Sequence, residues 1–173
     1  MEGTNDFTQI RHGFRKVIAV VKRLFKRYFI DAMGGMALGL FASLIIGTII
    51  GQLFQLPLLA GAQAIIDTIP QISAATGAAI GVGVAWGMKV RPLVLFSSAA
   101  TGTIGYALGG PIGAYLSAVV GAEFGQLVAG RTPIDIVVTP FVSIATGGLV
   151  GIFAGPGVNA FMQALGAFIN TAT

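Results

Sequence analysis

The sequence contains no cysteine and only one histidine, His12, among its 173 residues. The lack of cysteine excludes disulfides, thiolate metal sites, cysteine nucleophiles and a phosphorylated cysteine. Because His12 lies outside the apolar part of the chain, a histidine-based metal centre or phosphohistidine relay within a membrane is excluded as well. We therefore expect neither a metal site nor a cofactor.

Charged residues are also scarce. Asp, Glu, Lys and Arg make up 9% of the chain, whereas hydrophobic residues make up 55%. Soluble domains carry roughly 25% charged residues, so this chain has too little polar material for a water-facing exterior. The composition predicts an integral membrane protein with an all-α fold, a polytopic bundle of transmembrane helices.

Motifs for catalysis are missing too. The sequence shows no nucleophile–base pair, no cluster of metal ligands and no phosphate-binding loop. Its Gly-x-Gly runs lie inside apolar segments rather than between a strand and a helix, which rejects a dinucleotide-binding fingerprint. We predict no catalytic residue in this chain, and any phosphotransfer would need separate partner subunits.

Apolar segments separated by turn signals predict five to six membrane spans. Gly109-Gly110-Pro111 is expected to join two short helices, and Gly155-Pro156-Gly157 to end the fifth span. Residues 55–71 are expected to form an external connection. The predicted spans are 32–54, 72–88, 93–109, 112–129 and 135–154, with 158–170 as a shortened sixth span or a re-entrant piece.

Glycine is abundant, with 26 residues, about twice its usual share. Many of these glycines are four residues apart, which leaves a flat strip on one helix face where a neighbouring backbone can approach. This spacing predicts a tightly packed bundle, although some glycines could instead let the backbone unwind around a ligand. The groups are Gly35/Gly39, Gly47/Gly51, Gly77/Gly81, Gly83/Gly87, Gly105/Gly109/Gly113, Gly121/Gly125 and Gly147/Gly151/Gly155.

Seven of the ten Lys and Arg residues lie in residues 11–27, here called the basic segment. Their helical spacing leaves an apolar opposite face, which predicts an amphipathic helix at an anionic membrane surface. The alternative is a positively charged flank of the first span. No nucleic-acid-binding module accompanies the segment, so no nucleic-acid partner is expected. The seven residues are Arg11, Arg15, Lys16, Lys22, Arg23, Lys26 and Arg27.

Two parts of the chain follow from this pattern: a cytoplasmic amphipathic helix over residues 1–30 and a transmembrane domain over residues 31–173. If the spans alternate, the basic segment, Lys89 with Arg91, and Arg131 all fall on one side of the membrane. Because Lys and Arg favour cytoplasmic loops, that side and the N-terminus are expected to be cytoplasmic.

Glu123 is the charge that stands out within the apolar segments. A carboxylate at membrane depth is costly, so it usually faces protein or a watery cavity. One interpretation is a carboxylate at the membrane interface paired with Arg131 or Lys89. The other is a group that lines the path of a polar solute or couples its transport to protons.

Hydroxyl and amide side chains supply the remaining candidates for solute binding. Ser97, Ser98 and Thr101 form a patch in the third span, Thr139 precedes a proline in the fifth, and Asn159 lies in the final segment. Hydroxyls in helices commonly bond to their own backbone, so packing is the alternative explanation for most of these residues.

Long stretches of the chain resemble the EIIC-like membrane family of the bacterial phosphotransferase system, which includes perfringolysin O regulator-type proteins. The resemblance covers nearly everything from residue 26 onward. The stretches that carry it are "KRYFIDAMGGMALGLFASLIIGTI" (26–49), "GAAIGVGVAWGMKVRPLVLFSS" (77–98), "GGPIGAYLSAVVGAEFGQLV" (109–128), "DIVVTPFVSIATGGLVGIFAGPGV" (135–158) and "FMQALGAFI" (161–169).

The resemblance implies a permease component of a phosphotransferase-type sugar transport system in a bacterial cytoplasmic membrane. Family members are about twice this length, so the chain resembles their N-terminal half. A second-half permease chain or further copies of this chain are therefore expected partners, together with soluble phosphocarrier subunits and the bilayer. The alternative function is a membrane-embedded regulator or scaffold that acts through the basic segment.

Overall fold

In the computed structural model, residues 15–55 and 74–172 are described, and their regular structure is entirely helical. Three helices are long and apolar enough to cross a membrane, namely Arg15–Phe54, Pro92–Val128 and Asp135–Thr171. The all-α prediction is therefore confirmed for this part of the chain, whereas five to six spans stays a prediction. Arg11, His12 and most of the expected connection at 55–71 lie outside the described residues.

The first helix runs without a break from the basic segment into the first predicted span. Backbone angles remain helical at the junction, where Phe25 has φ −57° and ψ −47°. At 1.5 Å per residue, its 40 residues extend about 60 Å, roughly twice the hydrocarbon thickness of a bilayer. Its named parts are η1 (Lys26–Ala32), α2 (Met33–Leu40), η2 (Phe41–Ile45) and α3 (Ile46–Phe54).

Small residues allow α2 to pack antiparallel against α6 (Thr76–Gly87). Gly35 faces the backbone of Gly83, and Gly39 faces that of Ala79. A Cβ atom added to either glycine would overlap those backbone atoms, so only glycine permits this approach. The expected tight packing is confirmed at this contact.

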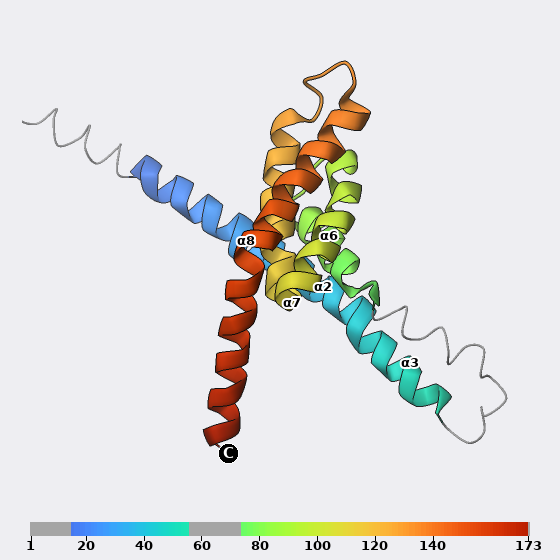
Figure 1. Ribbon diagram of the computed structural model, residues 1–173. Coiled ribbons are helices and arrows are strands. Elements are labelled where there is room, and N and C mark those ends of the chain that lie inside the picture. Colours follow the sequence, from blue (N-terminus) through green and yellow to red (C-terminus); the bar gives the residue numbers. More distant parts are fainter. Residues whose placement is uncertain (1–14, 56–73, 173) are drawn as a thin grey trace, which may run out of the picture.

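The helix α7 (Pro92–Val128) is two helices joined by a sharp reversal. Gly109 has φ −143° and ψ 19°, and Gly110 has φ 61° and ψ −154°, which is a conformation open essentially to glycine alone. The prediction that Gly109-Gly110-Pro111 joins two short helices is confirmed. Residues 92–108 and 111–128 then pack antiparallel as a hairpin, whose reversal is drawn in yellow in Figure 1.

The second predicted break is wrong. The helix α8 (Asp135–Ala172) continues through both Pro140 and Pro156, and its course bends midway (Figure 1). Proline removes one backbone donor but keeps a helical φ, so a long helix can bend at proline instead of ending there. Residues 158–170 are consequently the continuation of α8 rather than a separate helix.

Glycines spaced by four also allow α8 to pack closely against the hairpin. Gly147 approaches the carbonyl oxygen of Ser117 so closely that an added Cβ would lie 2.6 Å away, and Gly155 approaches Leu108 in the same way, at 2.8 Å from its Cβ. The result is a bundle in which the first helix packs on α6, α6 on the hairpin, and the hairpin on α8 (Figure 1).

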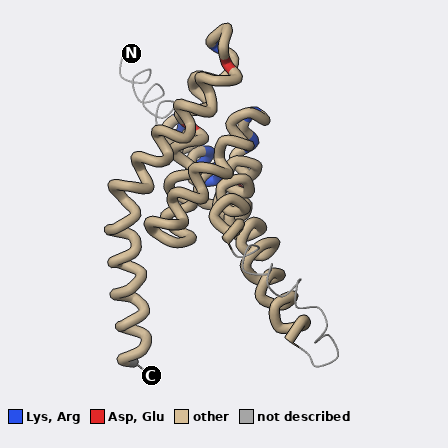
Figure 2. Tube along the Cα trace, turned by 45° about the vertical axis from the view of Figure 1, so that its right-hand side comes forward, with Lys and Arg blue, Asp and Glu red and all other residues tan. Residues whose placement is uncertain are grey.

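The charges gather at one end of this bundle. Gly87, which lies two residues before Lys89, abuts the backbone of Asp31, and Arg91 reaches the loop at Gly130. Figure 2 shows that the two arms formed by α3 and the end of α8 carry no Lys, Arg, Asp or Glu. The expectation that the three basic clusters share one side of the membrane stays a prediction.

Candidate functional site at the charged end of the bundle

Glu123 lies in the second half of the hairpin and binds two side chains of the first helix. Its Oε1 lies 2.9 Å from Nη2 of Arg27 and accepts a 3.0 Å hydrogen bond from the Tyr28 hydroxyl. The side chains of Arg27 and Glu123 are 38% and 31% exposed, so the pair is half-buried. The carboxylate therefore ties the N-terminal helix to the hairpin.

A further hydrogen bond joins the first helix to the second half of the hairpin. The Tyr115 hydroxyl donates a 2.7 Å hydrogen bond to the backbone carbonyl of Tyr28. Arg27 and Tyr28 both belong to η1, a π-helical turn of a kind that often marks functional sites. The Nε atom of Arg27 is buried and has no hydrogen-bond partner, so the guanidinium keeps an unused donor beside the carboxylate.

The partners expected for Glu123 were wrong. The sequence suggested Arg131 or Lys89 because Arg131 is only eight residues away along the chain. The structure instead brings Arg27 to the carboxylate from the first helix. This contact depends on how the helices pack, which local spacing does not reveal.

A second polar cluster holds together the loop before α7 and the loop between α7 and α8. Arg91 donates from its backbone to Gln126 at 3.0 Å, and its guanidinium donates to the Ala129 carbonyl. Across the loop, Oδ1 of Asp135 accepts from the Gly130 backbone at 2.8 Å and from the Thr139 hydroxyl at 2.6 Å. Thr139 is thus buried and already bound to a carboxylate.

The expected hydroxyl patch is buried inside the bundle. Ser97 bonds to the Leu93 carbonyl at 2.7 Å, Ser98 to that of Val94 at 2.9 Å, and Thr101 to that of Ser98 at 3.0 Å. Each hydroxyl satisfies its donor on its own helix, which matches the packing explanation.

Thr101 lies where the hairpin packs on α8, near the backbones of two further buried serines that the sequence did not single out, Ser117 and Ser143. Its Cγ2 would lie 2.9 Å from a Cβ on Gly121 and 2.6 Å from one on Gly147, and these added Cβ atoms would also approach the backbone oxygens of Ser143 and Ser117, respectively. Both serine hydroxyls are buried and have no partner. We call these three residues the hydroxyl seam, since they come from the two halves of the hairpin and from α8.

Asn159 stands apart from every other candidate. It is exposed on the far half of α8, where it accepts a 3.4 Å hydrogen bond from Gln163. Because the charged end lies at the opposite end of the bundle, the fold does not bring Asn159 together with Glu123.

The basic residues of the first helix divide into two groups. Arg27 faces the bundle, whereas Lys26 is exposed and lies 3.9 Å from Asp31. The remaining described members are exposed to the surroundings: Arg15, Lys16, Lys22 and Arg23.

Tyr28 and Tyr115 are further residues that the sequence analysis missed. Both occur within the quoted family stretches, but an isolated tyrosine in an apolar helix gives no signal of its partner. Among the described residues, no group of three His, Cys, Asp or Glu side chains could hold a metal ion.

Long apolar helices and glycine-mediated packing indicate an α-helical protein of the membrane. Residues 30–173 match the family described as "Phosphotransferase system, EIIC". The chain belongs to this family and is thus a membrane component of a phosphotransferase-type transport system, which works with other proteins of that system. No curated protein and no solved structure matches the chain.

Proposed function

We propose that the protein is a permease component that binds and translocates a sugar or a similar small polar solute. The observation that carries this proposal is the family match over residues 30–173. We propose a bacterial cytoplasmic membrane with the N-terminus in the cytoplasm, because seven of the ten Lys and Arg residues lie in residues 11–27 and such residues favour the cytoplasmic side. Soluble phosphocarrier subunits would supply the phosphoryl group.

Glu123 and Arg27 supply the chemistry that a sugar needs at the cytoplasmic end of its path. A carboxylate accepts hydrogen bonds from sugar hydroxyls, and a guanidinium donates them. Arg27 also has an unused donor at Nε. Both side chains are partly exposed, so a solute can reach them from outside the protein.

The hydroxyl seam extends this path into the bundle. Ser117 and Ser143 have unused hydrogen-bonding capacity, and unpaired buried hydroxyls call for an explanation. A small separation of α8 from the hairpin would expose both to a passing solute. Thr101 and Thr139 lie on the same elements, whereas Asn159 is too remote to join this path.

Uptake by cells tests the proposal. Cells that express the chain would be offered radiolabelled monosaccharides, disaccharides and sugar alcohols, one at a time. At least one should accumulate, and Glu123→Gln should reduce its uptake at least tenfold, because a hydrogen bond to a charged group contributes about 1.5–3 kcal/mol. Asp31→Asn is the matched control and should retain uptake. Unchanged uptake in Glu123→Gln would remove this residue from the mechanism.

A membrane-embedded regulator is the second candidate, and the exposed cations of the first helix favour it. Deleting residues 1–27 would also remove Arg27 from Glu123, so replacing four exposed cations with glutamine is a cleaner test. If the variant loses the regulatory response of the cell but keeps normal solute uptake, the regulator is supported. If the regulatory response is unchanged, the regulator is rejected. The four cations are Arg15, Lys16, Lys22 and Arg23.

A further inference from the structure

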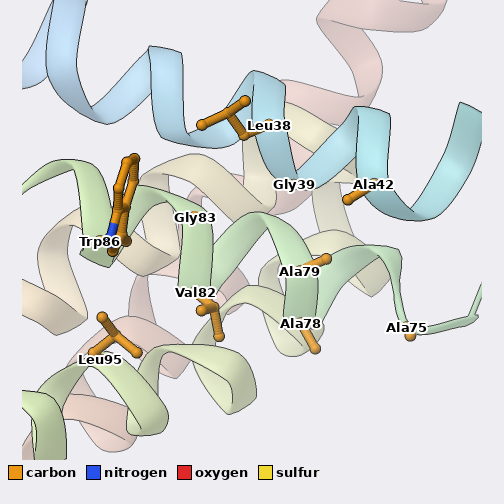
Figure 3. Close-up of a pocket in the computed structure, with 10 residues that line it drawn as sticks. All are labelled: Leu38, Gly39, Ala42, Ala75, Ala78, Ala79, Val82, Gly83, Trp86 and Leu95. Carbon is orange, nitrogen blue, oxygen red and sulfur yellow. The ribbon is translucent and has the colours of Figure 1, made fainter.

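An apolar groove runs between the first helix and α6 on the outside of the bundle. It is open to the surroundings and has a volume of about 600 Å³. Trp86 stands at one end and Ala75 at the other, and Leu38 covers it from α2 (Figure 3). All ten lining residues are apolar or glycine, so the groove suits a hydrocarbon chain.

The end marked by Trp86 adjoins a second hollow of different character. This hollow has a volume of about 320 Å³ and is lined by Asp31, Trp86, Gly87 and Lys89. It therefore offers one carboxylate and one ammonium group. Trp86 borders both spaces, and tryptophan favours the boundary between hydrocarbon and headgroups.

We infer that the groove and the hollow together bind one phospholipid with a phosphoethanolamine headgroup. An acyl chain lies in the groove, the phosphate lies near Lys89, and the ammonium group lies near Asp31. This assignment is based on charge complementarity, because a zwitterionic headgroup carries one charge of each sign and so does the lining of the hollow. Asp31 is 34% exposed and its contact with Lys26 is long, at 3.9 Å, so the carboxylate can accept a further donor.

Competing occupants fit the two hollows less well. An anionic lipid without an amine would leave Asp31 beside its own negative charge. A second protein copy would have to cover both the apolar groove and the charged hollow. A choline headgroup carries no N–H to donate to the carboxylate.

The chain offers a direct probe, because Trp86 is its only tryptophan and is 61% exposed. The full chain would be reconstituted in vesicles that contain phospholipids with brominated acyl chains, which quench tryptophan fluorescence on contact. Brominated phosphatidylethanolamine should quench Trp86 more strongly than brominated phosphatidylglycerol or phosphatidylcholine at equal content. Equal quenching by all three would overturn the inference.

Two headgroup variants locate the selectivity. Lys89→Gln and Asp31→Asn should each lower the preference for phosphatidylethanolamine by about twofold to fivefold, the range expected for an exposed ion pair. Arg131→Gln is the control, since Arg131 lies at the same end of the bundle and lines neither hollow. A preference that survives both variants would contradict the assigned headgroup contacts.

A third variant tests the acyl-chain groove. Ala42 lines the groove and is exposed, so Ala42→Phe fills the space with little effect on folding. It should weaken quenching, whereas Ala107→Phe, at an exposed site outside the groove, should not. Unchanged quenching in Ala42→Phe would show that the chain lies elsewhere. Shielding of Trp86 from every brominated lipid would instead show a protein partner and reject the lipid site.

Discussion

Gly34 and Gly35 are neighbours in α2 with opposite surroundings. A Cβ added to Gly35 would overlap the backbone of Gly83, whereas one added to Gly34 would meet nothing within 4 Å. Gly35→Ala should therefore force α2 and α6 apart and destabilise the protein by about 1–3 kcal/mol. Thermal unfolding of the purified protein in detergent measures this loss.

Gly34→Ala is the matched control. Alanine is the better helix former, so this change should be neutral or stabilise by up to about 1 kcal/mol. Equal effects of the two substitutions would contradict the backbone contact between α2 and α6.

The pair of Arg27 and Glu123 allows a second measurement on individual side chains. Because both groups are only half-buried, their interaction should contribute about 0.5–1 kcal/mol to stability. Thermal unfolding of Arg27→Gln, Glu123→Gln and the double variant gives this coupling. Lys26→Gln and Asp31→Asn form the control pair, whose longer 3.9 Å contact should couple less. No coupling between Arg27 and Glu123 would reject the contact.

At the scale of elements, the sequence predicted glycine-mediated packing and the hairpin reversal because both depend on local chemistry. Gly110 needs a backbone conformation that other residues avoid, so its sequence signal is strong. Pro156, between two glycines, gave a similar signal but lies in a bent helix. A Gly-Pro-Gly sequence is compatible with both outcomes, and here the helix continues with Gly155 packed against Leu108.

The partners of Glu123 were beyond sequence reasoning for a different reason. Arg27 is distant in the sequence, and its approach requires the first helix, α6 and the hairpin to pack in their final order. The hydroxyls of Ser117 and Ser143 are buried without partners where the hairpin packs on α8. No spacing rule within one helix reveals either arrangement.

The uninterrupted first helix gives a prediction at the same scale. Since the chain has no cysteine, spin labels can be attached at Lys22→Cys and Thr48→Cys without removing native thiols. A continuous helix places these positions about 40 Å apart. Double electron–electron resonance between the two spin labels measures this distance. If residues 15–30 instead turned to lie along the membrane surface, the distance would fall to about 30 Å.

For the whole molecule, we predict that the three basic clusters face the cytoplasm. Single cysteines at Arg23, Lys89 and Arg131 should all react with a membrane-impermeant maleimide from the cytoplasmic side only. A cysteine at Thr171, on the arm that points away from these clusters, serves as the contrasting position and should not react from that side. Reaction of any of the first three from the opposite side would contradict the shared orientation.

The most direct measurement is equilibrium binding of a panel of sugars and sugar alcohols to the purified protein, followed by its thermal stability. A ligand that binds only the folded state raises the unfolding temperature in a saturable way. We predict that at least one sugar does so, and that Glu123→Gln weakens its affinity at least tenfold while Asp31→Asn leaves it unchanged. Stabilisation by no sugar, or equal affinity in Glu123→Gln, would contradict the proposed function.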